Sequence, residues 1–85
     1  MYKNKNPDGS LNISGKKIAK LRKEMNPRTS QRVLADMLQL NGIDLDKNAI
    51  QKIESGKRFV TDIELKSLAK VLGVTSDELL KEFEK

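Results

Sequence analysis

The side chains best suited to specific recognition chemistry lie in residues 45–55, LDKNAIQKIES. On a helix, Ile50 and Ile53 would share one face and anchor it in a core, which leaves the opposite face polar. Asn and Gln amides can pair bidentately with adenine in the DNA major groove, and a Lys ammonium can donate to guanine. Four residues outside the apolar pair carry such groups and could pair with base edges: Lys47, Asn48, Gln51 and Lys52. Each of them taken alone also fits an ordinary solvated helix face.

Other classes of chemistry lack their usual residues. The chain contains no Cys and no His, which removes the thiolate and imidazole ligands of a zinc finger. The same absence removes the common nucleophiles and general bases of enzymes. We therefore expect no metal site, no cofactor and no enzymatic activity, and no motif points to a small-molecule ligand.

The positive charge is concentrated in the first third of the chain. The formal net charge is +5, and residues 1–28 contain eight Lys or Arg against two acidic residues. Residues 61–85 contain four basic residues against six acidic ones. This asymmetry favours one side that faces a polyanion and another that is turned away from it. A solvated lysine-rich surface would give the same counts, so the choice depends on the elements that position the charges.

Five short helices are predicted from residue 13 onward, because apolar residues recur there at three- and four-residue spacing. The predicted fold class is therefore all-α. Each helix follows a residue whose side chain can cap it: Ser14, Ser30, Asp46, Thr61 and Thr75. Glu64 and Glu78 complete capping boxes with the last two of these residues.

Glycines and a proline mark the predicted helix ends: Pro27, Gly42, Gly56 and Gly73. Glycine readily adopts the left-handed conformation that closes a helix, and proline prevents a helix from continuing. In the loop after the polar segment, Phe59 and Val60 are apolar. We expect both side chains to fill the core beneath that loop.

Residues 1–12 combine Pro, Gly and Asn without apolar periodicity. They are predicted to form a flexible N-terminal tail, followed by one domain over residues 13–85. Lys3 and Lys5 in the tail could form a minor-groove arm or have no role. The start of the chain does not resemble a signal peptide, and no apolar stretch reaches the roughly 18 residues that span a bilayer. We expect a cytoplasmic protein.

Four segments, taken in order, resemble the Cro/C1-type (Xre-like) helix-turn-helix domain of phage repressors and bacterial regulators: LRKEM, SQRVLADML, NAIQKIESGKR and TDIELKSLAKVLGVTSDELL. The resemblance covers about residues 14–82, and its most specific part is Ile50-x-x-Ile53-Glu54-x-Gly56. It implies a compact five-helix bundle of the lambda-repressor-like type. It also implies a sequence-specific double-stranded DNA-binding transcriptional regulator, a repressor, which reads an operator with helix 47–55.

The resemblance further implies residues that contact the DNA backbone or hold the reading helix. Gln31 matches a family position that contacts phosphate at a helix N-terminus, where free N–H groups favour anions. The other expected phosphate contacts are Arg32, Ser55, Lys57 and Arg58. The family also pairs an Arg in the first helix, here Arg22, with the Glu that ends the reading helix, here Glu54. This ion pair is expected to orient the reading helix rather than to touch bases.

The sequence leaves three questions open. The spacing between the second and third helices is longer than is usual in the family, and the extra residues at 39–45 affect the angle of the reading helix. A homodimer is expected through residues 76–85, with Leu80 and Phe83, although these side chains could instead pack inside the monomer. The alternative function is an antitoxin-like or other protein-interaction module, which a large exposed apolar patch would favour.

Overall fold

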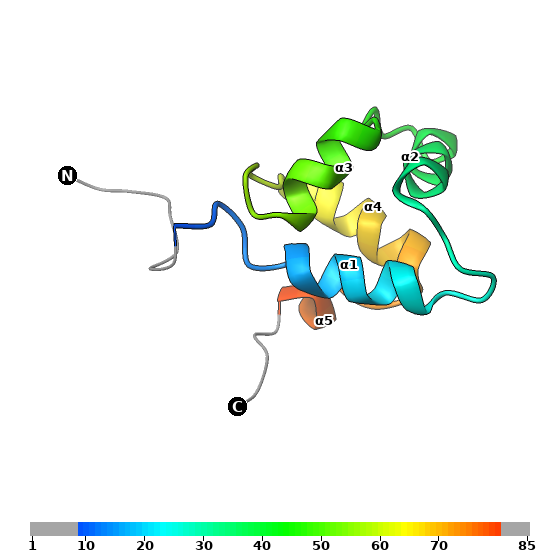
Figure 1. Cartoon of the computed structure of the whole chain (residues 1–85), viewed down its shortest axis with the longest axis horizontal. Helices are drawn as coiled ribbons and strands as arrows, with labels where there is room; N and C mark the ends of the chain where they lie inside the picture. Colours follow the sequence, from blue (N-terminus) through cyan, green and yellow to red (C-terminus); the bar gives the residue numbers. More distant parts are fainter. Residues whose placement is uncertain (1–8, 81–85) are drawn as a thin grey trace.

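The computed structural model describes residues 9–80, in which every regular element is a helix (Figure 1). The five helices are α1 (Gly15–Glu24), α2 (Gln31–Leu40), α3 (Lys47–Glu54), α4 (Asp62–Leu72) and α5 (Ser76–Leu80). The all-α prediction is confirmed. The last part of the predicted fifth helix, residues 81–85, lies outside the described residues, and so do Lys3 and Lys5.

Four of the predicted helix starts are capped as expected. In each case a side-chain oxygen accepts a hydrogen bond from the backbone N–H three residues later, and the capping residues are Ser30, Asp46, Thr61 and Thr75. Glu64 returns a hydrogen bond to the backbone N–H of Thr61 at 3.1 Å, which completes the capping box of α4. These bonds satisfy N–H groups that have no partner inside the helix.

The start of α1 differs from the prediction. Ser14 already has helical backbone angles and makes no side-chain capping bond, whereas a capping side chain usually belongs to a residue with extended backbone. Asn12 caps the helix instead, because its Oδ1 accepts the N–H of Gly15 at 2.7 Å. The sequence predicts a flexible tail over residues 1–12, but Leu11 and Asn12 at its end are bonded to the helical domain. The tertiary contacts of Asn12 described below are the physical reason.

The end of α2 closes with the bonding pattern of a Schellman motif. Gly42 has a φ of +80°, and its N–H donates to the carbonyl of Gln39 at 3.0 Å. The N–H of Ile43 donates to the carbonyl of Leu38 at 3.0 Å, and the side chain of Ile43 packs against the core. The extra residues at 39–45 are therefore divided between the end of α2 and the turn that leads to α3.

One apolar core joins the helices. Its buried residues are Ile18, Leu34, Ala35, Leu38, Leu45, Ile50, Ile53, Leu65, Leu68, Ala69 and Leu79. Helix α3 packs against α1 and α2, while α4 contacts α1, α2 and α5 (Figure 1). Val60 packs against this core as predicted, but the prediction for Phe59 is wrong, because its exposed fraction is 51%. Among the described residues, no helix is long and apolar enough to cross a membrane.

Candidate nucleic-acid interface

Helix α3 has one completely buried side and one exposed polar side. Ile50 and Ile53 have exposed fractions of 0% and lie in the core. The four residues predicted to read bases are all exposed: Lys47, Asn48, Gln51 and Lys52. Asn48, Gln51 and Lys52 point away from the two isoleucines, whereas Lys47 lies in the first turn on the side of Ile50; no described part of the chain covers any of the four. The structure therefore presents two amides and two ammonium groups on one accessible helix.

The last residue of α3 is held by α1. The Nε of Arg22 donates to Glu54 Oε2 at 2.7 Å, and its Nη2 donates to Oε1 at 2.9 Å. The two side chains have exposed fractions of only 9% and 8%. The hydrogen bonds from Arg22 to this carboxylate raise the pKa of the guanidinium, and burial opposes them. The pair that the resemblance implied is thus formed, with the planar two-point geometry that favours Arg over Lys.

The same carboxylate also connects α2 to α3. Gln31, the first residue of α2, donates from its Nε2 to Glu54 Oε1 at 2.9 Å. Arg22 uses its remaining terminal nitrogen to donate to the backbone carbonyl of Thr29 at 3.0 Å. Glu54 therefore bonds residues of both α1 and α2 at the end of α3, and its partner Arg22 bonds the loop before α2. The family resemblance implied the ion pair, but no residue pattern indicated the bonds from Arg22 to Thr29 and from Gln31 to Glu54.

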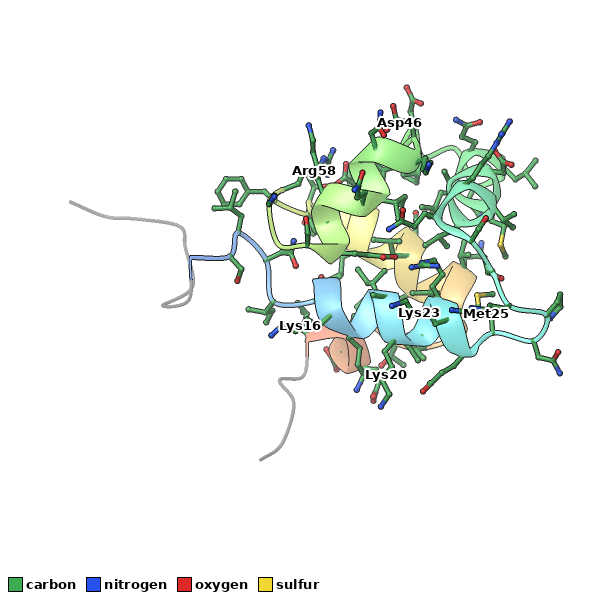
Figure 2. All side chains as sticks on the ribbon, viewed as in Figure 1. Lys16, Lys20, Lys23, Met25, Asp46 and Arg58 are labelled. Atoms are coloured by element: carbon green, nitrogen blue, oxygen red, sulfur yellow. The ribbon has the colours of Figure 1, made fainter. Side chains whose placement is uncertain are left out.

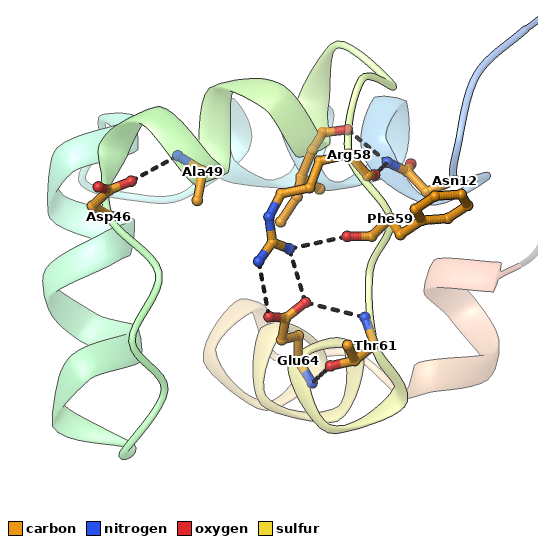
Figure 3. Close-up of polar contacts among 8 residues, drawn as sticks. Asn12, Asp46, Ala49, Arg58, Phe59, Thr61 and Glu64 are labelled. Carbon is orange, nitrogen blue, oxygen red and sulfur yellow. Dashed lines mark hydrogen bonds and ion pairs between the residues drawn. The ribbon is translucent and has the colours of Figure 1, made fainter.

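Among the expected phosphate contacts, Arg58 has a different partner. Its guanidinium bonds both carboxylate oxygens of Glu64 in α4, at 2.9 and 3.2 Å, and also the carbonyl of Phe59 (Figure 3). The hydrogen bonds from Arg58 are the main cause that lowers the pKa of Glu64, and the same bonds raise the pKa of Arg58. Because its charge is compensated within the chain, the structure makes Arg58 a link between this loop and α4.

The remaining predicted phosphate residues are accessible. Arg32 is exposed in the first turn of α2, and Ser55 and Lys57 are exposed just after α3. The N–H of Lys57 donates to the carbonyl of Lys52 at 2.8 Å, which closes the end of α3. The structure thus places basic and hydroxyl side chains beyond the C-terminal end of α3 and at the start of α2.

Asn12 is a contact that the sequence did not predict. Its Nδ2 donates to the carbonyl of Ile53 at 3.1 Å and to that of Arg58 at 2.7 Å (Figure 3). Asn is a residue type that commonly caps helices, but Asn12 lies three residues before the first helical residue rather than directly before it. Its bonds to Ile53 and Arg58, 41 and 46 residues away, could not be predicted from the residues around Asn12.

The concentration of positive charge lies mainly on α1. Lys16, Lys20 and Lys23 are exposed and follow one another along this helix at four- and three-residue spacing (Figure 2). Residues with this spacing share one face of a helix. The basic first third of the chain thus contributes an accessible lysine face beside the buried Arg22.

At the other end of the bundle, α5 has both a core residue and an exposed apolar residue. Leu79 is completely buried, whereas Leu80 has an exposed fraction of 44%. Lys17 in α1 bonds Glu78 at 3.1 Å and so ties α5 to the bundle. Phe83, the other residue of the predicted dimer surface, lies outside the described residues.

Comparisons with known proteins agree with this geometry. A family model described as helix-turn-helix matches residues 18–79, which is most of the described chain. The chain is 37% identical over 71 residues to Control protein C.MunI from Mycoplasma sp, and the alignment covers 84% of this chain and 88% of that protein. No solved structure gives a significant match.

Proposed function

The chain belongs to the Xre-like helix-turn-helix family of DNA-binding transcriptional regulators, and we propose that it recognises one particular operator by inserting α3 into the major groove. The observation that carries this proposal is the division of α3 into a buried apolar side and an exposed polar side. The major groove is about 12 Å wide and admits one helix. An anchored helix with an uncovered polar face therefore has the shape and the chemistry that base reading requires.

The four exposed residues of α3 have distinct expected partners. Asn48 and Gln51 each offer an acceptor and a donor that match the N6 and N7 edge of adenine. Lys47 and Lys52 offer donors that match the O6 and N7 acceptors of guanine. We therefore expect an operator half-site that contains both A·T and G·C pairs at contacted positions.

Backbone contacts would come from two places on the same surface. The N-terminus of α2 offers the N–H groups of Gln31 and Arg32 to phosphate, and its dipole favours an anion there. The bond to Glu54 directs the Gln31 amide, and a primary amide nitrogen carries a second N–H that can donate to phosphate. Ser55 and Lys57 would hold the phosphates at the far end of α3. Such contacts position the protein but carry no sequence information.

We further propose that the protein acts as a homodimeric repressor. Two copies would place their α3 helices in successive turns of the groove, about 34 Å apart, on a near-palindromic operator. Leu80 supports α5 as the dimer surface, because it is a large apolar side chain left exposed beside buried Leu79. Occupation of an operator that overlaps a promoter would block transcription from it.

Selection of bound sequences from a random pool of duplexes tests the proposal directly. We expect an enriched palindromic motif with half-sites separated by about one helical turn. Enrichment of a single half-site would argue against the dimer but not against base reading. No enrichment at low salt, with a folded protein, would overturn the proposal and would favour the protein-interaction alternative.

A further inference from the structure

The residues just before α1 lie across the end of α3 and the loop that follows it. We call residues 10–12 the clasp. Within it, the N–H of Leu11 donates to the carbonyl of Gly56 at 2.8 Å. Asn12 donates to the carbonyls of Ile53 and Arg58 and accepts from Gly15. One short segment therefore bonds the last turn of α3, the loop after it and the start of α1.

The start of α1 is also in direct contact with the backbone of α3. A Cβ added to Gly15 would overlap the carbonyl oxygen of Ile53 and would lie 3.2 Å from that of Glu54. Only a glycine allows this approach, because the obstacle is backbone rather than a flexible side chain. The distance between α1 and the end of α3 is thus set by a missing side chain at Gly15 and by the amide of Asn12.

One of the two carbonyls that Asn12 bonds, that of Ile53, belongs to the last turn of α3 and also accepts the N–H of Gly56 at 3.1 Å. The carbonyls of the last turn of a helix lack their usual partners within it. Asn12 supplies a donor to one of these carbonyls in α3 and, from the same nitrogen, to the loop carbonyl of Arg58. The guanidinium of Arg58, in the same loop, bonds the carboxylate of Glu64 in α4 (Figure 3). The loop is therefore fixed between α1 and α4.

We propose that Asn12 is a positioning residue for DNA recognition, which fixes the end of α3 and the 55–58 loop relative to α1. This inference rests on the proposed function. Base-reading side chains lie on α3, whereas Ser55 and Lys57 lie in the loop, so the two sets of contacts need one fixed relative position. Binding sites of this kind tolerate deviations of only about 0.5 Å. Asn12 acts only through α3 and the 55–58 loop and does not itself contact bases or phosphates.

The substitution Asn12→Asp separates the two roles of the side chain. A carboxylate still accepts the N–H of Gly15 and caps α1, and its charge is favourable at a helix N-terminus. It cannot donate to the carbonyls of Ile53 and Arg58. The measurement is the ratio of the affinity for the selected operator to the affinity for an unrelated duplex, at one fixed salt concentration.

We expect this ratio to fall about threefold to tenfold, which corresponds to the usual contribution of a hydrogen bond. The matched control is Asn41→Asp, which makes the same charge change and removes the amide bond to the carbonyl of Met37 at the far end of α2. Added negative charge weakens both affinities together. The control is therefore expected to keep the wild-type ratio.

A second pair of variants tests the fixed position of α1 against the end of α3 without a change in charge. Gly15→Ala must push α1 away from α3, whereas Gly73→Ala introduces backbone strain at a φ of +77° with nothing within 4 Å of the new Cβ. Both are expected to lower the melting temperature, but only Gly15→Ala is expected to lower the ratio. This pair decides the question if Asn12→Asp does not fold at the assay temperature.

The outcomes separate the two proposals. If the wild-type protein shows no preference for any operator, the proposed function fails. If the wild type is specific but Asn12→Asp and Gly15→Ala keep its ratio, the positioning role is overturned. An equal fall in the ratio for Asn12→Asp and Asn41→Asp would also overturn it, since the charge alone would then account for the effect.

Discussion

The guanidinium of Arg22 in α1 grips both carboxylate oxygens of Glu54, the last residue of α3, at 2.7 and 2.9 Å. Both side chains are almost fully buried. A buried ion pair adds little net stability, but removal of one partner leaves an uncompensated charge away from water. The orientation of α3 therefore depends on a buried contact with α1, which leads to the first prediction.

Arg22→Met is expected to lower the free energy of unfolding by about 3–5 kcal/mol, because Glu54 is then buried without its counter-charge. The double variant Arg22→Met/Glu54→Leu is expected to recover much of this loss. Urea unfolding of both single variants and the double variant measures the coupling. Single variants whose effects simply add would contradict the prediction.

Asn48→Ala is expected to cost about 1–3 kcal/mol of operator affinity, because a side chain that pairs bidentately with a base is lost. The loss should be confined to one base-pair position, where the variant should accept other bases. Binding to a panel of operators substituted one position at a time provides the measurement. Equal losses on every duplex would instead assign Asn48 to a backbone or structural role.

Lys57→Ala and Arg58→Ala are expected to differ although they are neighbours. Lys57 is exposed, and its loss should reduce the slope of log affinity against log salt by about 1. Arg58 is already paired with Glu64, so its replacement should leave the slope unchanged and lower the melting temperature. Titrations at several salt concentrations separate the two variants, and a reduced slope for Arg58→Ala would support the predicted phosphate contact of that residue.

The Arg58–Glu64 pair predicts a dependence of stability on pH. The hydrogen bonds from Arg58 lower the pKa of Glu64 from its ordinary value of 4.5. A carboxyl with a lowered folded-state pKa contributes stability that is fully present above its unfolded pKa and is lost as the pH falls through the folded value. Wild type is therefore expected to exceed Glu64→Gln in stability by about 1–2 kcal/mol at pH 7.

This difference should begin to shrink as the pH falls below 4.5, where the carboxyl of the unfolded chain takes up a proton, and should be lost once the pH is below the lowered pKa of Glu64 in the folded protein. Chemical denaturation of both proteins across this range checks the prediction. The control is Asp36→Asn, at an exposed position of α2. A difference between wild type and Glu64→Gln that stays constant with pH would contradict the ionic contribution.

Leu80→Glu is expected to weaken association of the proposed dimer, since it places a charge on the exposed apolar position of α5. Sedimentation analysis should show a shift toward monomer, and operator binding should become weaker while half-site preference is kept. Ile63→Glu, at another exposed apolar position but in α4, is the matched control. An unchanged sedimentation profile for Leu80→Glu would remove α5 from the dimer surface.

The sequence determined those features that depend on residues close together in the chain. Apolar spacing identified the five helices, and the caps at Asp46 and Thr61 identified where α3 and α4 begin. The same spacing predicted which side of α3 is buried, since Ile50 and Ile53 define it. Such features follow from hydrogen bonds and periodicity within a few residues, so their signal is local. The Arg22–Glu54 pair came from the family resemblance rather than from spacing.

Only the tertiary structure decided which side chains became partners over long distances. Arg58 could have faced solvent, and its bond to Glu64 depends on how the loop meets α4. Asn12 was assigned to a tail because its own neighbourhood is polar and aperiodic, yet its partners lie 41 and 46 residues away. A polar side chain could form hydrogen bonds of similar strength with many different donors and acceptors. Its actual partner is therefore the one that the packed helices bring within about 3 Å.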